Sequence, residues 1–211
     1  MVFTISTGSF ELESHLCEPE DLPSGAVILC HPHPLYGGTM DNRVVYRAAK
    51  AAAKAGFAAL RFNFRGVGKS TGHYDQGLGE KEDVAAAIDW IEGRYPGKPL
   101  AVLGYSFGAW VGLQVGCGDP RIRALVGIGL PLDMYNFEFL LDCPDPSLYI
   151  VGTRDEFCSP MNLENLIRRL PFVSRVHRIQ GADHFFSENV EDVERLVEQF
   201  FRGLLPDQAM P

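Results

Sequence analysis

The feature that most limits how this chain can fold is the regular alternation of strand-like and helix-like segments. The strand-like segments are short apolar runs, such as AVILC at 26–30, of the kind that a sheet buried on both faces requires. Parallel strands joined through helices form right-handed crossovers, and the helices then cover both faces of the sheet. The predicted strands span 3–7, 10–17, 26–30, 57–64, 99–104, 123–129, 147–152 and 175–180, and the predicted helices span 42–56, 80–95, 106–117, 161–170 and 189–201.

This alternation predicts an α/β fold of three layers around a mostly parallel sheet of about eight strands. The first two strands are expected to form an antiparallel hairpin that turns at Gly8. The 211 residues contain no internal repeat or linker-like segment, so we expect a single domain over 1–211. In such sheets the binding site lies at the carboxyl ends of the strands, which is where we look for catalytic residues.

Composition and charge exclude several classes of function. The formal net charge is −8 and no basic stripe is present, which argues against a nucleic-acid binder. No apolar run is long enough to span a membrane, and the N-terminus lacks the basic and apolar regions of a signal peptide. We therefore expect a cytoplasmic protein, a monomer or small homo-oligomer, with no nucleic-acid or membrane partner.

The cysteines are odd in number and form no CxxC pair. This pattern fits free or buried thiols in a reducing compartment better than a disulfide framework or a structural zinc site. The five cysteines are Cys17, Cys30, Cys117, Cys143 and Cys158.

The stretch FRGVGKST at 64–71 ends in the way that a phosphate-binding P-loop ends. A P-loop needs G-x-x-x-x-G-K-[ST] followed by a helix, but the position of its first glycine holds Asn63. The next stretch, TGHYDQGLG at 71–79, has no helical periodicity that would place a helix N-terminus at the phosphate. We interpret the stretch as a turn leaving a strand, braced by Arg65 and Ser70.

A second motif has the context that the first one lacks. Strand 99–104 runs directly into GYSFG at 104–108, and the helix-like segment 106–117 follows. This is the arrangement of a G-x-S-x-G nucleophile elbow, in which glycines permit a strained positive-φ turn that lifts the Ser106 hydroxyl above the sheet. The N–H of Phe107 would stabilise a developing oxyanion from the helix N-terminus. The alternative interpretation is a Gly-rich surface turn.

A serine nucleophile needs a base to take its proton and a carboxylate to orient that base. For an elbow of this type the chain order is serine, acid, histidine. Of the histidines after Ser106, His177 falls inside a predicted strand, whereas His184 follows the last strand. We predict His184 as the base and Asp155, which follows strand 147–152, as the acid. The competing acids are Asp133, Glu156 and Asp183.

A second oxyanion donor is expected from CHPHPLYGG at 30–38, the loop after the third strand. His31 and His33 form an H-x-H pair, which is a common spacing of metal ligands. A zinc site needs further converging ligands, and the prolines and glycines fit a tight loop equally well. We therefore expect no metal, a structural hydrogen-bonding role for His31 and a backbone N–H donor at His33.

Five motifs in matching order carry a resemblance to the α/β-hydrolase family over nearly the whole chain. They are CHPHPLYGGTMDNRVV, NFRGVGKSTG, GYSFGAWVG, GTRDEFCSP and GADHFF. The chain is most similar to the small, lidless, dienelactone-hydrolase-like serine hydrolases of bacteria. The resemblance implies Ser106 as nucleophile, His184 as base and Asp155 as acid. Dienelactone hydrolases proper use a cysteine nucleophile where this chain has serine, so their substrate is not implied.

The resemblance also implies an oxyanion hole and an open site. The backbone N–H groups of Phe107 and His33 would form the hole, with Leu35 as the alternative second donor because many relatives have H-G-x-P in place of HPHP. Many members carry a lid after the sixth strand, but here only residues 130–146 separate two strands, so the site should be shallow and open. The residues predicted to line an acyl pocket are Tyr36, Phe157 and Phe185.

Together these patterns predict a serine hydrolase that acts on carboxylic esters through an acyl-enzyme, with small or extended acyl substrates and no cofactor. A thioesterase, lactonase or peptidase would use the same three residues. Outside this class, the alternatives are a non-catalytic binding protein on the same scaffold and a nucleotide binder.

Overall fold

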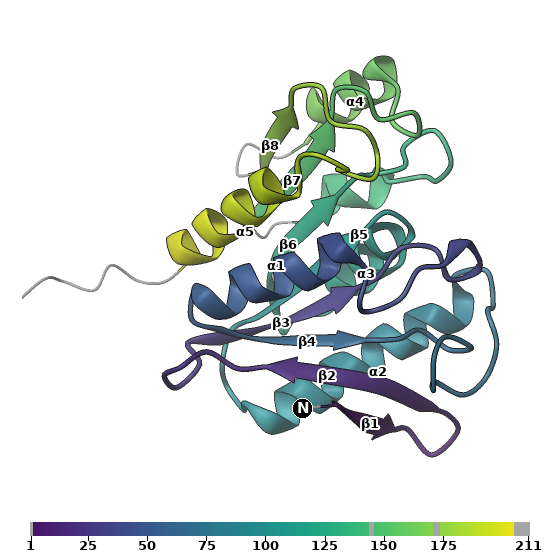
Figure 1. Ribbon diagram of the computed structural model, residues 1–211, viewed down its shortest axis with the longest axis vertical. Helices are drawn as coiled ribbons and strands as arrows, with labels where there is room; N and C mark the ends of the chain where they lie inside the picture. Colours follow the sequence, from purple (N-terminus) through teal and green to yellow (C-terminus); the bar gives the residue numbers. More distant parts are fainter. Residues whose placement is uncertain (1, 144–145, 171–173, 205–211) are drawn as a thin grey trace, which may run out of the picture.

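The computed structural model describes residues 2–143, 146–170 and 174–204. Eight strands form one sheet in the order β1-β2-β4-β3-β5-β6-β7-β8, with helices on both faces (Figure 1). This arrangement confirms the predicted three-layer α/β fold. The strands are β1 (Val2–Ser6), β2 (Glu11–Cys17), β3 (Gly25–Cys30), β4 (Phe57–Phe62), β5 (Leu100–Tyr105), β6 (Ile122–Ile128), β7 (Ser147–Gly152) and β8 (Ser174–Ile179). The helices are α1 (Arg43–Lys54), α2 (Leu78–Arg94), α3 (Phe107–Gly118), α4 (Pro160–Ile167) and α5 (Val190–Leu204), with 3-10 helices η1 (Pro34–Tyr36) and η2 (Glu138–Asp142).

The predicted hairpin is present at one edge of the sheet. β1 and β2 pair antiparallel, with Val2 opposite His15, and Gly8 has the positive φ of 86° that the turn between them requires. β2 is also antiparallel to β4, whereas the pairs from β4 through β3, β5, β6 and β7 to β8 are all parallel. The carboxyl ends of the parallel strands therefore meet at one side of the molecule, the right-hand side of Figure 1.

The central strands are buried on both faces because helices cover each face. Val27 and Leu29 of β3 pack into the cluster under α1 and α5, while Ala26 and Ile28 pack into the cluster under α2 and α3. Fully burying a valine, leucine or isoleucine side chain stabilises a fold by about 1.5–3 kcal/mol. The continuous apolar sequence of β3 thus supplies both sides of the core.

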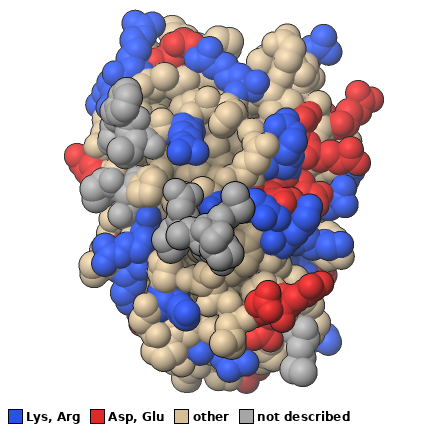
Figure 2. Space-filling view, turned by 90° about the vertical axis from the view of Figure 1, so that its left-hand side faces the viewer, with Lys and Arg blue, Asp and Glu red and all other residues tan. Residues whose placement is uncertain are grey.

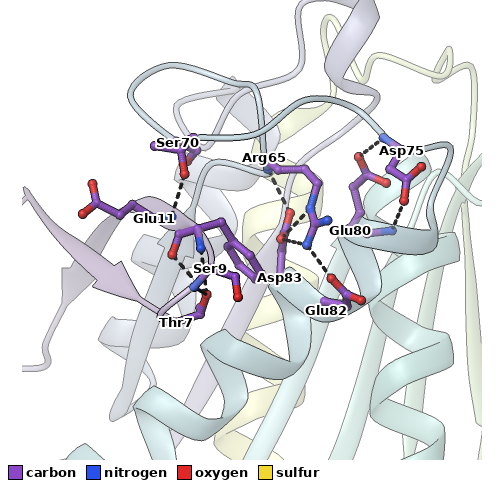
Figure 3. Close-up of polar contacts among 12 residues, drawn as sticks. Thr7, Ser9, Glu11, Arg65, Ser70, Asp75, Glu80, Glu82 and Asp83 are labelled. Atoms are coloured by element: carbon purple, nitrogen blue, oxygen red, sulfur yellow. Dashed lines mark hydrogen bonds and ion pairs between the residues drawn. The ribbon is translucent and has the colours of Figure 1, made fainter.

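The FRGVGKST stretch forms a turn that ties the end of β4 to its neighbours. The Ser70 hydroxyl donates to the carbonyl of Asn63 at 2.7 Å and accepts the N–H of Glu13 at 2.9 Å. The Arg65 guanidinium donates to the fully buried carboxylate of Asp83 on α2 at 2.9 and 2.7 Å (Figure 3). The residues singled out by the phosphate-loop pattern therefore brace the turn.

The expectation of free thiols is wrong for two of the five cysteines. Cys117, at the end of α3, and Cys143, just after η2, form a disulfide with Cα atoms 5.3 Å apart. They are 26 residues apart in sequence, and the packing of η2 against α3 brings them together, so their spacing carried no sign of the bond. The argument from cysteine usage to a reducing compartment no longer holds. The free cysteines are Cys17, Cys30 and Cys158.

The charges on one face and the apolarity of the helices relate to the expectation of no nucleic-acid and no membrane partner. Figure 2 shows the side of the molecule from which the parallel strands start, and there Lys and Arg lie intermixed with Asp and Glu. None of the helices within residues 2–143, 146–170 and 174–204 combines the length and the apolarity needed to cross a membrane.

Candidate active site

The elbow between β5 and α3 is a tight turn built on two glycines. Ser106 has φ 56° and ψ −120°, a conformation that L-residues rarely adopt. A Cβ on Gly104 would lie 2.3 Å from the carbonyl oxygen of Gly108, and one on Gly108 would lie 2.3 Å from that of Cys30. The N–H of Ser106 donates to the carbonyl of Ile128 at 2.9 Å, which fixes the turn to β6.

His184 and Asp155 lie directly beside the elbow. The Nε2 atom of His184 is 2.9 Å from the Oγ atom of Ser106, and its Nδ1 atom is 3.0 and 2.9 Å from the two carboxylate oxygens of Asp155. The exposed fractions of His184 and Asp155 are only 4% and 7%. The structure thus forms a continuous hydroxyl–imidazole–carboxylate chain from the three residues that the motif order selected.

Aromatic contacts hold the His184 ring in place. The Tyr105 hydroxyl donates to the carbonyl of His184 at 3.1 Å, and burial raises the pKa of Tyr105, so it remains a neutral donor. The Phe157 ring contacts the imidazole edge-on, with centroids 4.7 Å apart, and the N–H of Phe157 donates to Asp155 at 2.9 Å. The histidine and its acid are therefore fixed by the same short loop.

The competing residues have other contacts. The Asp133 carboxylate accepts hydrogen bonds from the backbone and hydroxyl of Ser159 and from Asn162, and so secures the start of α4. Asp183 accepts the N–H and the hydroxyl of Ser187, and the N–H of Ser187 lowers the pKa of Asp183. Glu156 and His177 are exposed, the latter on β8.

His31 is fully buried and joins the 30–38 loop to the end of β4. Its Nε2 atom accepts the N–H of Phe64 at 3.0 Å, so the proton sits on Nδ1 and is donated to the carbonyl of Pro32 at 2.6 Å. Burial lowers the pKa of His31 to about 4, which keeps the ring neutral. Within the described residues, no three His, Cys, Asp or Glu side chains gather as metal ligands.

The two candidates for the second oxyanion donor differ in their surroundings. The Leu35 N–H donates to the Nδ1 atom of His33 at 3.2 Å. The Nε2 atom of His33 lies 3.2 Å from the hydroxyl of Tyr74, a residue that the sequence reading left in an unassigned loop. Phe107 is the first residue of α3, where backbone N–H groups have no intrahelical partner.

A cleft of about 260 Å³ opens beside Ser106. Tyr36, Phe157 and Phe185, the residues expected to line an acyl pocket, all line it. Phe186, another aromatic residue of the histidine loop, is fully buried in the core instead. The sequence reading missed two lining residues from the segment 130–143, Met134 and Tyr135, and no Asp, Glu, Lys or Arg is among the described residues that line the cleft.

Comparison with known proteins places this fold and site in a family. Residues 10–140 match the family model described as X-Pro dipeptidyl-peptidase (S15 family). An uncharacterized protein of Rickettsia prowazekii (strain Madrid E) is 37% identical over 182 residues, covering 82% of this chain and 76% of that protein.

Two solved structures are similar over almost their whole length. An alpha-beta serine hydrolase homologue from Coxiella burnetii is 32% identical with a TM-score of 0.88, over 95% of this chain and 96% of that one. A lidless α/β serine hydrolase from Xanthomonas campestris is 30% identical with a TM-score of 0.89, over 100% of this chain and 96% of that one. The chain therefore belongs to the S15 family and is a serine hydrolase of the α/β-hydrolase fold without a lid.

Proposed function

We propose that this serine hydrolase cleaves carboxylic esters through an acyl-enzyme on Ser106. The observation that supports this most directly is the hydrogen-bonded chain from the Ser106 hydroxyl through His184 to Asp155. Serine is a weak nucleophile until a base takes its proton, and a neutral imidazole held by a carboxylate is suited to that task.

The reaction proceeds in two halves. The Ser106 oxygen attacks the ester carbonyl while His184 takes its proton, and Asp155 stabilises the resulting imidazolium. The carbonyl oxygen becomes an oxyanion that accepts hydrogen bonds from the backbone N–H groups of Phe107 and His33. Collapse of this intermediate expels the alcohol, which receives the proton from His184. Water then attacks the acyl-enzyme by the same route and releases the carboxylic acid.

The family model suggests a second candidate, removal of an X-Pro dipeptide from a peptide N-terminus. That activity has to hold the free ammonium group of the substrate, and a cationic group withdrawn from water needs a carboxylate or an equivalent partner. The described lining of the cleft is aromatic and uncharged, with Tyr36, Tyr135 and Phe185 among its members. This surface favours an uncharged acyl group over a peptide terminus.

Two measurements test the proposal. A fluorophosphonate probe should label the wild-type protein at Ser106 and should leave Ser106→Ala unlabelled; a folded wild-type protein that resists the probe would refute the nucleophile. A panel of p-nitrophenyl esters, thioesters, lactones and Gly-Pro-p-nitroanilide should give the highest kcat/KM with esters. Preference for the dipeptide anilide would instead establish the peptidase.

A further inference from the structure

We propose that Tyr74 is a positioning residue for the oxyanion hole, because its hydroxyl accepts the Nε2–H of His33 and so holds the imidazole that the Leu35 N–H binds on its other side, and with it the 30–38 loop. Tyr74 acts through His33, whose Nε2 atom lies 3.2 Å from the Tyr74 hydroxyl. The inference rests on the proposed function. It also distinguishes between the N–H groups of His33 and Leu35 as the second oxyanion donor.

The hydrogen bonds around His33 define its protonation. The Leu35 backbone N–H can only donate, so the Nδ1 atom of His33, 3.2 Å away, must present a lone pair. A neutral imidazole then carries its proton on Nε2, which lies 3.2 Å from the Tyr74 hydroxyl. The Nε2–H group therefore donates to the Tyr74 oxygen. Burial lowers the pKa of His33, which favours this neutral form.

The same bonds select the oxyanion donor. The Leu35 N–H is occupied by the His33 ring, and the N–H groups of Tyr36 and Gly38 both donate to the carbonyl of His33 at 3.1 Å. Pro34 has no N–H. Of the two candidate donors, the N–H of Leu35 is thus taken by the His33 ring, and we assign the second oxyanion donor to the N–H of His33.

Tyr74 can hold His33 only if its own loop is fixed, and a buried carboxylate fixes it. Glu80 has an exposed fraction of 0% and accepts the N–H of Asp75 at 2.9 Å (Figure 3). It also accepts the N–H of Gly77 at 2.7 Å. Gly77 has φ 94°, and a Cβ there would lie 2.5 Å from the Trp110 ring on α3. The loop that carries Tyr74 is therefore clamped between the start of α2 and the elbow helix.

The Tyr74 ring also joins the two oxyanion donors into one cluster. Its centroid lies 5.0 Å from that of His33 and 5.9 Å from that of Phe107, and the His33 and Phe107 rings are 4.9 Å apart. Burial, with the Glu80 carboxylate as a smaller cause, raises the pKa of Tyr74, so its hydroxyl stays protonated. Removing this hydroxyl should therefore break the hydrogen bond to His33, while the aromatic ring at position 74 keeps its packing in the cluster.

The test uses Tyr74→Phe in the full-length protein. With a p-nitrophenyl ester we expect kcat to fall on the order of tenfold with little change in KM, because a whole oxyanion donor is worth about 10²–10³. Fluorophosphonate labelling of Ser106 should reach completion but at a lower rate. The matched control is Tyr95→Phe, which removes a hydroxyl bonded to Glu18 at the far end of α2 and should leave kcat and labelling rate unchanged.

A spectroscopic measurement separates this role from simple packing. Histidine ¹⁵N shifts should show wild-type His33 with the proton on Nε2, and Tyr74→Phe should shift the Nε2 resonance, because the hydrogen-bond acceptor of that N–H is lost. His33→Asn should retain more activity than His33→Ala, because an Asn side-chain oxygen can still accept the Leu35 N–H.

The outcomes distinguish the two proposals. Wild-type protein that never labels would overturn the esterase proposal, and the oxyanion assignment with it. A labelled wild type whose His33 carries its proton on Nδ1 would overturn only the inference about Tyr74, as would a Tyr74→Phe variant with wild-type kcat.

Discussion

The two sides of the cleft are built in different ways. The 30–38 loop is held by hydrogen bonds from backbone N–H groups to its histidine side chains, such as those from Phe64 to His31 and from Leu35 to His33. The 130–143 segment contributes Met134 and Tyr135 to another part of the wall, and it is held by the stacking of Tyr135 on Trp110, with centroids 4.4 Å apart, and by the disulfide at its end. Backbone hydrogen bonds fix atoms that a reaction needs, whereas side-chain contacts set the shape of a pocket. We therefore expect changes on the loop side to lower kcat and changes on the wall to raise KM.

The largest effect is expected from removing the proposed nucleophile, a change that should leave the structure of both sides of the cleft intact. Ser106→Ala should reduce ester turnover by at least about 10³-fold, the scale seen when a residue of such a triad is removed. Its thermal unfolding should match that of the wild type, which calorimetry checks. Retained turnover in Ser106→Ala would place the chemistry elsewhere.

The next effect tests how firmly the loop side depends on a neutral imidazole. The pKa of His31 is lowered from 6.5 to about 4 in the folded protein, so the unfolded chain binds the proton first as the pH falls. The free energy of unfolding should therefore decrease by about 3 kcal/mol between pH 6.5 and pH 4 from this group alone. His31→Gln should be less stable at pH 7 but should lose less stability on acidification, as measured by urea unfolding. Equal losses in both proteins would contradict the assignment.

A smaller effect tests the close approach of the elbow to the 30–38 loop. In Gly108→Ala the new Cβ would lie 2.3 Å from the Cys30 carbonyl oxygen and 2.5 Å from that of His31. We expect the free energy of unfolding to fall by about 2 kcal/mol, with a loss of kcat, because backbone cannot move aside cheaply. The control is Gly118→Ala in the same helix, where a Cβ meets nothing within 4 Å. Equal free energies of unfolding for the two variants would show that the elbow does not pack tightly against the 30–38 loop at Gly108.

The smallest effect tests the wall. Tyr135→Ala removes an aromatic pair from the lining, and such pairs contribute about 0.5–1.5 kcal/mol, so KM for an aryl ester should rise about fivefold with kcat nearly unchanged. Phe139→Ala is the matched control, because Phe139 pairs with Phe137 in the same segment but does not line the cleft. A fall in kcat with unchanged KM for Tyr135→Ala would contradict the expectation that the two sides of the cleft affect different kinetic constants.

Sequence reasoning reached the parts of the fold that local patterns encode. The apolar run of β3 and the strand–turn–helix context of Ser106 predicted the sheet and the elbow, and the chain order pointed to Asp155 and His184. Helix α2 begins at Leu78 rather than at residue 80. The Glu80 side chain accepts the Gly77 N–H and so caps the first turn, and the apolar pattern of the sequence does not show this turn.

Contacts between distant loops could not be predicted. Tyr74 reaches His33 only because Glu80 folds its loop back, and Cys117 meets Cys143 only because η2 packs on α3. A single sequence carries such neighbours as ordinary loop residues. The polar and covalent links that shape the cleft are for this reason visible in the structure and not in the pattern of residues.

The disulfide has a practical consequence for measurements on this protein. It joins α3, the helix that starts beside Ser106, to the segment that carries Met134 and Tyr135. A preparation exposed to reductant would therefore contain oxidised and reduced molecules, which differ by two hydrogens in mass and in how this part of the cleft wall is held. Titration of Ser106 with a fluorophosphonate would count both forms as one enzyme, since both carry the proposed nucleophile. Comparison of kinetic constants between laboratories would then require that thiol content be determined for each sample.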